Sequence, residues 1–308
     1  MHITFEQAYN QYLNYVDSKL KEQSKRAVKD RLKNHILPFF KDKNIYDLRE
    51  IDVLEWQGYI EKFNYSYKYE KTLHTALVTF LNFCIKYLDL NKNVASIVGT
   101  FKDNGKITKK IDYYTYSEFK KFIKYVDNDI YRQFFIFMFF VGTRPGETMA
   151  LKFSDLNNSI ISINKTISER NIDGTRYIGT PKTKSSIRDI EIDKKLNKDL
   201  LKLKKYYQSK YKDNNYDYFI FGGKKPLAST TINRYKNKAC NLANLKKIRL
   251  HDFRHSHATL LLQNDLYIKE ISRRLGHSNT STTLNIYVHT DKEQEKRVIK
   301  TLNSIRLF

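Results

Sequence analysis

The chain has 308 residues, enough for two domains or one large one, and its 41% hydrophobic content is typical of a folded protein rather than a disordered one. The formal net charge of +23 favours a polyanionic partner, because each neutralised phosphate releases condensed counterions. The longest apolar run, residues 134–141, is shorter than the ~20 residues that span a bilayer, and no long basic amphipathic helix indicates a membrane surface. An AT-rich genome also produces lysine-rich proteins, so charge alone leaves the partner open.

Cysteine usage and the N-terminus indicate the cellular compartment. Cys84 and Cys240 are far apart in the sequence and form neither a CxxC pair nor a disulfide framework. The first residues lack the basic and apolar blocks of a signal peptide. We therefore expect a protein of the reducing cytoplasm.

Residues 1–98 are predicted to form an all-helical domain, because apolar residues recur there at helical spacing. Four helices are expected. The first covers residues 5–16, and the second runs from an N-cap at Ser24 to the residue before Pro38. The third begins after an N-cap at Asp52, and the fourth carries an apolar stripe from Leu73 to Leu88. The next segment, residues 99–111, is polar, basic and glycine-containing, which is typical of an interdomain linker.

The remaining part, residues 112–308, mixes helices and strands. A capping box at Thr115 opens a helix, and a buried helix is expected near residues 131–141. Three β-rich runs then predict a three-stranded antiparallel meander over residues 160–167, 176–178 and 187–192. From Asp193 onward the pattern is mostly helical again.

Arginine, lysine, histidine and tyrosine gather in four short segments of this second part. Arg144 ends the most apolar predicted helix within a Gly/Pro-bounded turn, where a buried guanidinium requires an anionic partner. An internal salt bridge to Glu147 is the alternative to a functional role. Lys182 is predicted at the exposed tip of a hairpin, and taken alone it is better explained as one more surface lysine of a lysine-rich protein.

Two further segments carry histidines. His251 and Arg254 are three residues apart and share one face of a predicted helix, so an imidazole and a guanidinium can reach the same phosphate. His277 follows a glycine that is expected to end a short helix. A metal site made of His251, His255 and His257 is a competing reading, but these segments contain no HExxH pattern and no carboxylate-rich shell.

Tyr287 follows His277 by ten positions, and the whole series resembles the tyrosine recombinase, or phage integrase, family. The matching motifs are TRPGE at 143–147, PKTKSS at 181–186, HDFRHSHAT at 251–259, LGHSNTSTT at 275–283, and the tyrosine before Val288 and His289. The resemblance covers nearly all of the chain. It implies a mainly α fold with a small antiparallel β-sheet: an all-α core-binding domain over 1–98, a linker over 99–111, and an α+β catalytic domain over 112–308 with a tail helix near 292–308.

The resemblance also implies catalytic roles. Tyr287 would attack the scissile phosphate and form a 3′-phosphotyrosyl link. Arg144 and Arg254 would hold the non-bridging oxygens, and His277 would add a hydrogen bond. These cations and dipoles suit the charge that gathers on phosphate oxygens in the transition state.

Two more residues complete the implied set. His251 would serve in proton transfer near the nucleophile, and Lys182 would protonate the 5′-oxygen leaving group. Because the tyrosyl ester conserves bond energy and the basic side chains supply positive charge, neither ATP nor another cofactor nor a metal is expected. The implied reaction is the site-specific cleavage and rejoining of DNA, for the integration or excision of a mobile element.

The implied partners are double-stranded DNA with inverted-repeat core sites, a homotetramer in the synaptic complex with a monomer in free solution, and accessory excision or DNA-bending factors. On the fourth predicted helix, a polar face presents candidate DNA contacts at Lys68, Lys71, Thr72 and Thr75; a solvated face is the alternative. The tail helix is expected to dock on a neighbouring protomer, or else on its own domain. Because the helices begin near residue 4, the arm-binding domain of many phage members is either absent or has been trimmed from this chain.

Three other functions compete with this interpretation. A monomeric type IB topoisomerase shares the chemistry, but the integrase-like motifs argue against it. A non-catalytic DNA-binding regulator on the same scaffold has no need of Tyr287. A lysine-rich structural protein without enzymatic activity is the third alternative, and a failure to bind DNA at moderate salt would favour it.

Overall fold

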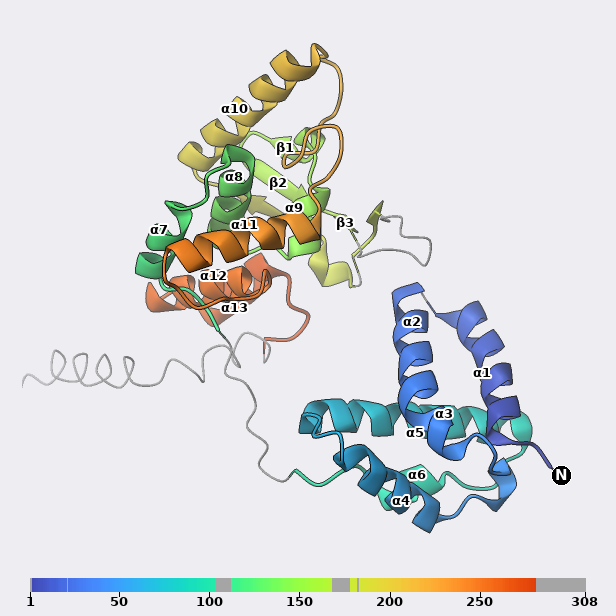
Figure 1. Cartoon of the computed structure of the whole chain (residues 1–308). Helices are drawn as coiled ribbons and strands as arrows, with labels where there is room; N and C mark the ends of the chain where they lie inside the picture. Colours follow the sequence, from blue (N-terminus) through green and yellow to red (C-terminus); the bar gives the residue numbers. More distant parts are fainter. Residues whose placement is uncertain (1, 21, 104–111, 168–177, 182, 281–308) are drawn as a thin grey trace, which may run out of the picture. The chain divides into compact units, whose positions relative to one another are not determined.

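The computed structural model describes residues 2–20, 22–103, 112–167, 178–181 and 183–280. The chain divides into two compact units, Met1–Lys109 and Lys110–Phe308, which we call unit 1 and unit 2 (Figure 1). None of the helices within the described ranges has the length and apolar character needed to cross a membrane.

Unit 1 is built from helices around one aromatic-rich core (Figure 1). Its helices are α1 (Phe5–Lys19), α2 (Glu22–Arg31), α3 (Leu37–Phe40), α4 (Glu50–Glu61), α5 (Tyr67–Leu88) and α6 (Val94–Val98). Trp56 of α4 is fully buried in this core, and its indole N–H donates to the carbonyl of His35 at 2.9 Å. The core continues into the segment expected as a linker, because the Phe101 ring packs 5.8 Å from that of Trp56.

The second predicted helix differs from the structure at both ends. α2 begins at Glu22, so Ser24 lies inside the helix rather than at its N-cap. The expected stop before Pro38 was wrong: a turn of π-helix at Leu32–Ile36 follows α2 and leads into α3. Pro38 sits in the first turn of α3, where its missing N–H is not needed for a helical hydrogen bond.

The third predicted helix begins slightly earlier than expected. α4 has Arg49 at its N-cap, and Asp52 is the third helical residue instead of the cap. The Asp52 carboxylate reaches back to accept the backbone N–H of Arg49 at 2.8 Å. The prediction of Asp52 as the cap was therefore wrong, and its carboxylate instead satisfies the backbone N–H of the cap residue from inside the helix.

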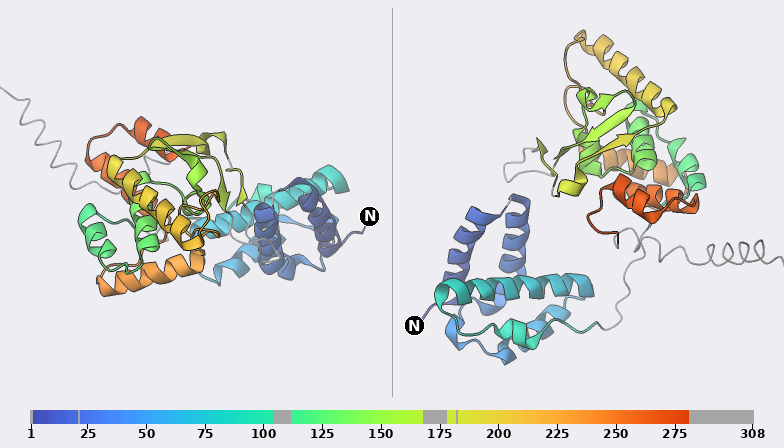
Figure 2. Two further views of the ribbon diagram at one scale, coloured as in Figure 1. Left: turned by 90° about the horizontal axis from the view of Figure 1, so that it is seen from above. Right: turned by 180° about the vertical axis from the view of Figure 1, so that it is seen from behind.

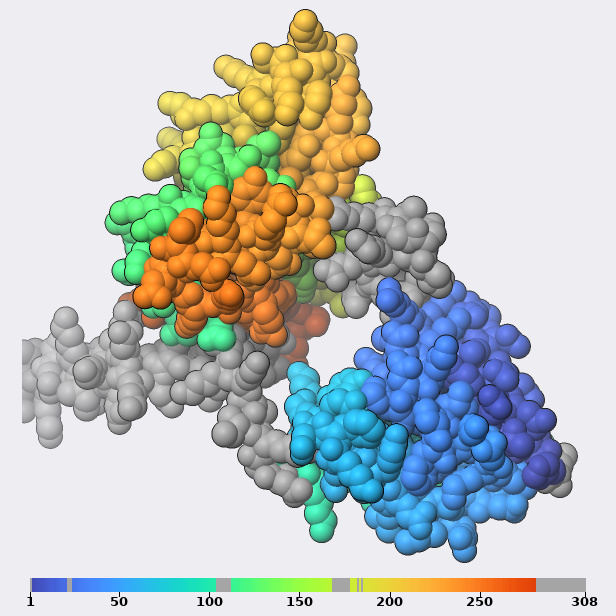
Figure 3. All heavy atoms as spheres, in the orientation of Figure 1, coloured from blue at the N-terminus to red at the C-terminus, as the bar shows by residue number. Residues whose placement is uncertain are grey.

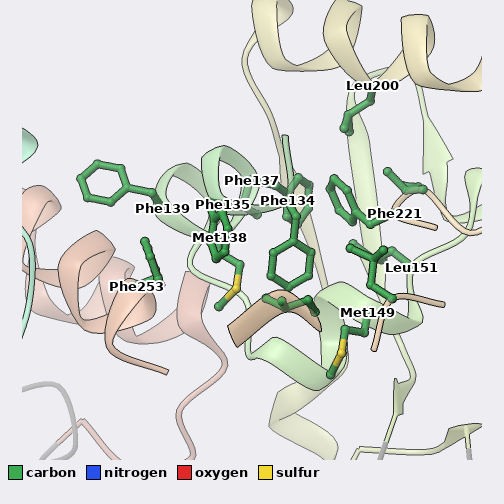
Figure 4. Packing of buried hydrophobic residues seen from close by; sticks show 14 of the residues in the cluster. Phe134, Phe135, Phe137, Met138, Phe139, Met149, Leu151, Leu200, Phe221 and Phe253 are labelled. Atoms are coloured by element: carbon green, nitrogen blue, oxygen red, sulfur yellow. The ribbon is translucent and has the colours of Figure 1, made fainter. Parts of the chain in front are cut away.

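Unit 2 packs its helices around α8, the most apolar segment of the chain (Figure 4). The helices are α7 (Tyr116–Ile123), α8 (Asp129–Val141), α9 (Pro145–Ala150), α10 (Lys194–Tyr211), α11 (Ser229–Leu242), α12 (Asp252–Gln263) and α13 (Ile268–Leu275). The ring of Phe135 lies 5.3 Å from that of Phe253 on α12, and Phe134 lies 5.5 Å from Phe221 (Figure 4). α11 covers one face of the unit (Figure 3).

The strands of unit 2 form two small antiparallel sheets, on the side that faces away from α11 (Figure 2). The strands are β1 (Leu156–Asn157), β2 (Ile160–Ile163), β3 (Thr166–Ile167), β4 (Ile178–Gly179) and β5 (Arg188–Glu191). One sheet has the order β1-β2-β5, with Ile161 opposite Ile190, and the other pairs β3 with β4.

The predicted three-stranded meander was therefore wrong in its pairing. The run 160–167 is split between the two sheets, and the Lys165 ammonium beside the break binds the Asp155 carboxylate at 2.7 Å. The last strand pairs with β2 instead of β4, and β1 was missed because it has only two residues.

Candidate active site

The site begins where α8 ends. Gly142 caps α8 in the left-handed region, with φ of +74°, and its N–H donates to the carbonyl of Met138 at 3.1 Å. Two residues later Arg144 becomes the N-cap of α9, so the chain turns sharply between two helices. The turn brings the Arg144 side chain out of the apolar core, where it is 34% exposed.

The carboxylate of Glu147 fixes one side of the Arg144 guanidinium. Glu147 is 2% exposed; its Oε1 accepts from Arg144 Nη1 at 2.6 Å, and its Oε2 accepts the backbone N–H of Arg144 at 2.9 Å. The salt bridge considered as an alternative role for Arg144 is therefore present. It does not use all of the guanidinium, since Nη2 donates to the carbonyl of Gly276 at 3.3 Å.

Arg254 of α12 is a buried cation next to Arg144. It is 1% exposed and donates to two backbone carbonyls, of Gly142 at 3.0 Å and of Leu275 at 2.6 Å. Burial, followed by repulsion from Arg144, lowers its pKa to about 9, so the guanidinium is still charged at neutral pH. Guanidinium charge is thus held in place by neutral carbonyl dipoles.

His277 joins this cluster from the end of α13. Gly276 ends the helix in the left-handed region, with φ of +70°, and directs the next residue away from the helix axis. Burial and the charges of Arg254 and Arg144 lower the pKa of His277 to about 3. The imidazole is therefore neutral at physiological pH.

His251 lies at the N-terminus of α12, with its ring 5.0 Å from that of His255. Surrounding protein atoms displace water from part of the ring, and His255 and Arg254 repel a proton, so the pKa of His251 is lowered although its outer surface remains exposed. Four of the six sequence-predicted site residues, Arg144, His251, Arg254 and His277, are thus in one neighbourhood.

Lys182 and Tyr287 lie outside the described residues. The neighbours of Lys182 are described: Ser186 is buried, its hydroxyl accepts from Arg144 Nη1 at 3.2 Å, and it contacts the Thr183 hydroxyl at 2.9 Å. The hairpin predicted to carry Lys182 was wrong, because β4 and β5 belong to different sheets and a short 3-10 turn at Lys184–Ser186 precedes β5.

Arg188 is a site residue that the sequence analysis missed. Its side chain is 7% exposed, and Nη2 donates to Glu147 Oε2 at 3.0 Å. The available signal was the alternation of β5: Arg188 is two residues from the buried Ile190 and so shares its face of the sheet. An arginine on a buried face needs an anion.

The competing metal reading finds no support in the described ranges, where no group of three or more His, Cys, Asp and Glu side chains is arranged to hold an ion. His257 is instead a core residue, 2% exposed, whose Nδ1 lies 2.9 Å from the carbonyl of Phe139. Its Nε2 accepts from Arg274 at 3.3 Å. These contacts fix a neutral tautomer that donates through Nδ1.

The candidate DNA contacts of unit 1 lie along α5. Lys68 and Lys71 are exposed, and their backbone carbonyls accept the hydroxyls of Thr72 and Thr75 at 2.8 Å each. The two threonines line a shallow groove of about 200 Å³ that also includes Arg31. The threonine hydroxyls still have free lone pairs, and the groove combines them with a cation.

Replacing Gly142 by alanine is expected to destabilise unit 2 strongly. A Cβ at Gly142 would lie 2.3 Å from Cδ2 of His257, and the residue's positive φ is unfavourable for alanine. Backbone strain and overpacking together predict a loss of about 2–5 kcal/mol in the free energy of unfolding, measured by denaturant titration followed by circular dichroism.

Gly58 offers a matched control, because nothing lies within 4 Å of a Cβ built there in the middle of α4. Gly58→Ala should stabilise unit 1 by about 0.5–1 kcal/mol. The chain's single tryptophan, Trp56, reports on unit 1 through its fluorescence, which Gly142→Ala should leave unchanged. A wild-type unfolding curve for Gly142→Ala would contradict the packing around Gly142.

The buried His257 predicts that unit 2 loses stability in mild acid. Burial, followed by repulsion from Arg274, lowers its pKa from 6.5 to about 3. As the pH falls below 6.5, His257 takes up a proton in the unfolded state but not in the folded state, so the free energy of unfolding decreases. The loss from this residue reaches about 2 kcal/mol near pH ~5.

His257→Gln should weaken this pH dependence, since its amide can keep the hydrogen bond to Phe139 without titrating. The measurement is denaturant unfolding of both proteins at neutral and mildly acidic pH. Equal losses of stability in the two proteins would show that His257 titrates normally in the folded state.

Comparison with known proteins identifies the family. Residues 111–294 match the model of the phage integrase family, and residues 4–60 match that of the phage integrase N-terminal SAM-like domain. The ICEBs1 integrase of Bacillus subtilis (strain 168) is 29% identical over 282 residues, which cover 89% of this chain and 76% of that protein. The integrase of Staphylococcus phage L54a is 31% identical over 174 residues, 53% of this chain and 49% of that protein.

Solved structures show the same fold. The Tn1549 transposon integrase in complex with transposon right end DNA superposes with a TM-score of 0.75 at 19% identity, covering 98% of this chain and 100% of that one. A lambda integrase tetramer bound to a Holliday junction gives a TM-score of 0.66 at 17% identity, covering 92% and 77%. With well over half of its residues matched by the family model, the chain belongs to the phage integrase family and is a tyrosine recombinase.

Proposed function

We propose that this recombinase cleaves and rejoins DNA through a covalent 3′-phosphotyrosyl intermediate on Tyr287, and that it integrates or excises a mobile element. The observation that carries the proposal is the buried guanidinium of Arg254, held by two carbonyls beside Arg144. Arg254 feels the positive charges of Arg144 and Arg188 and the negative charge of Glu147. This local excess of positive charge is complementary to a phosphodiester, and more so to its transition state.

Arg144 and Arg254 are assigned to the non-bridging phosphate oxygens. Arg144 has a partly exposed side chain that can reach DNA, whereas Arg254 is pre-positioned in the protein interior. His277, neutral because of its lowered pKa, donates one further hydrogen bond to the phosphate. Such fixed donors lower the barrier because they need no reorganisation as charge develops.

Proton transfer is assigned to His251 and Lys182. The lowered pKa of His251 keeps its imidazole neutral, so it can accept the proton that Tyr287 loses as its oxygen bonds to phosphorus. The bond from phosphorus to the 5′-oxygen breaks at the same time, and Lys182 supplies the proton to that oxygen. The reverse sequence of transfers rejoins the strand without ATP, since the tyrosyl ester conserves the bond energy.

Unit 1 and the ends of the chain have proposed roles in DNA binding and assembly. We assign residues 1–98 to the core-binding domain, 99–111 to the linker, and 112–308 to catalysis. The DNA is double-stranded with inverted-repeat core sites, and the active assembly is a tetramer. The tail helix near 292–308, outside the described residues, docks on a neighbouring protomer in this proposal.

The reaction is tested with nicked suicide duplexes made from candidate core sites. The short oligonucleotide between the cleavage position and the nick, which carries the free 5′-hydroxyl, diffuses away, so a covalent protein–DNA adduct accumulates and survives denaturing electrophoresis. We expect this adduct to form in the presence of EDTA. Relaxation of supercoiled plasmids without site preference would instead favour a type IB topoisomerase, and a chain that binds these sites without forming adduct would be a DNA-binding regulator.

Lys68 and Lys71 are expected to contact the phosphate backbone. Replacing either one by alanine should weaken binding to all DNA sequences alike and reduce the slope of log K against log salt by about 1. Lys92, which is paired with Glu50 at 2.7 Å, is the control on unit 1. If Lys92→Ala lowers the slope as much as the α5 variants do, the α5 face has no special role.

A further inference from the structure

Arg188 connects three segments that carry candidate site residues. Its Nε donates to the carbonyl of Arg274 at 2.7 Å, in the last turn of α13 before His277. Its Nη1 donates to the carbonyl of Ser186 at 2.9 Å, in the turn that follows Lys182. A Cβ on Gly276 would lie 3.0 Å from the Arg188 side chain, so β5, which carries Arg188, and the end of α13 are in tight contact.

The same guanidinium shares the Glu147 carboxylate with Arg144. Arg188 Nη2 lies 3.0 Å from Oε2, and its Nη1 lies 3.4 Å from Oε1. Arg144 Nη1 takes Oε1 at 2.6 Å. Each oxygen thus accepts from both residues, which fixes the carboxylate plane and with it the Arg144 guanidinium.

The charge state of Glu147 depends on these arginines. Burial by itself would raise the pKa of the Glu147 carboxyl, but the charge and hydrogen bonds of Arg188, followed by those of Arg144, bring the pKa below its ordinary value. Arg254 of α12 is the third cation that interacts with Glu147. Without Arg188, burial would oppose ionisation with only two cations against it.

We propose that Arg188 is a positioning residue for strand cleavage, which holds Glu147, the α13 terminus and the turn after Lys182 so that Arg144 keeps a fixed place beside the scissile phosphate. This inference rests on the proposed function. Arg188 itself is not expected to touch DNA, because each of its guanidinium nitrogens donates to a protein acceptor.

The proposal predicts a new pH dependence. In Arg188→Gln, Glu147 takes up a proton at a higher pH than in the wild type, and Arg144 then loses its counter-charge. The cleavage rate of the variant, divided by that of the wild type, should be reduced about 10-fold to 100-fold at mildly alkaline pH, as expected for a misplaced catalytic cation. The ratio should fall further in acid, by at most about tenfold per pH unit.

The experiment measures single-turnover adduct formation on one suicide substrate from mildly acidic to mildly alkaline pH. Arg188→Lys keeps the charge but cannot reach all four acceptors, so it should be slower than wild type with an unchanged pH profile. Adding Glu147→Gln to Arg188→Gln should remove the extra acid dependence. Arg132→Met, which breaks an ion pair to Asp129 elsewhere on α8, should behave as wild type.

The outcomes separate this inference from the proposed function. If the wild type forms no adduct, the proposed function fails and Arg188 is not at issue. If the wild type is active and Arg188→Gln cleaves at the same rate, or at a slower rate whose ratio to wild type is constant with pH, Arg188 has no positioning role through Glu147. Thermal unfolding of each variant shows whether a slower cleavage rate results from unfolding of unit 2. If Arg188→Gln is unfolded, the cleavage rate of Arg188→Lys is compared with that of the wild type instead.

Discussion

Tyr287→Phe is expected to abolish the covalent adduct while leaving DNA binding nearly unchanged. The substitution removes the attacking oxygen and keeps the aromatic ring, so the side chain keeps nearly the same shape but no bond to phosphorus can form. The cations around Arg254 remain to bind the phosphate. The measurement is adduct yield on suicide substrates, together with the dissociation constant from gel shift.

Tyr267→Phe provides the matched control for this loss. Tyr267 precedes α13 and is 77% exposed, so its hydroxyl is accessible but distinct from the proposed nucleophile. This variant should form adduct at the wild-type rate. Adduct that persists in Tyr287→Phe and disappears in Tyr267→Phe would reassign the nucleophile.

Arg254→Met should reduce the cleavage rate by about 100-fold to 1,000-fold, the usual effect of removing one preorganised donor from a charge-developing site. The stability of unit 2 should change little. Two hydrogen bonds, to Gly142 and Leu275, are lost, but a buried cation repelled by Arg144 is lost with them. Single-turnover kinetics and thermal unfolding measure the two effects.

Arg249→Met is the control for Arg254. Arg249 lies five residues earlier, and its guanidinium binds the Asp252 carboxylate at 2.8 Å while remaining 75% exposed. The buried Asp252 carboxylate still accepts the backbone N–H of residue 249 at 2.7 Å in this variant, so the cleavage rate should stay within a few-fold of wild type. A reduction as large as that of Arg254→Met would mean that the start of α12, rather than the buried charge, determines the rate.

The sequence predicted the parts of the site that are encoded in short, ordered motifs. Arg144, Arg254 and His277 were each found beside a glycine turn or on one helix face, where local geometry determines direction. Their proximity was predicted by family resemblance, since the contacts of Arg144 with Gly276 and of Arg254 with Leu275 join residues more than 20 positions apart. The spacing of residues along the sequence does not predict contacts between positions so far apart.

Other features escaped because tertiary contacts determined them. Arg188 stands alone in a short strand, and its significance depends on Glu147, 41 residues away in the chain. The pairing of β5 with β2 instead of β4 likewise depends on which edge is free in the folded unit. Pro38 was expected to end a helix, but the π-helical turn before it lets the chain continue into α3, where Pro38 lies in the first turn.

Locating the nucleotide in the trapped adduct identifies the nucleophile and the polarity of cleavage in one experiment. Trypsin cleavage after Arg274 and Lys292 yields a peptide, residues 275–292, in which Tyr287 is the single tyrosine. Mass spectrometry of the nuclease-treated and trypsin-digested adduct should place a 3′-phosphate-linked nucleotide on Tyr287. A nucleotide on any other residue would show that Tyr287 is not the nucleophile, and a link through a 5′-phosphate would rule out the proposed 3′-phosphotyrosyl intermediate.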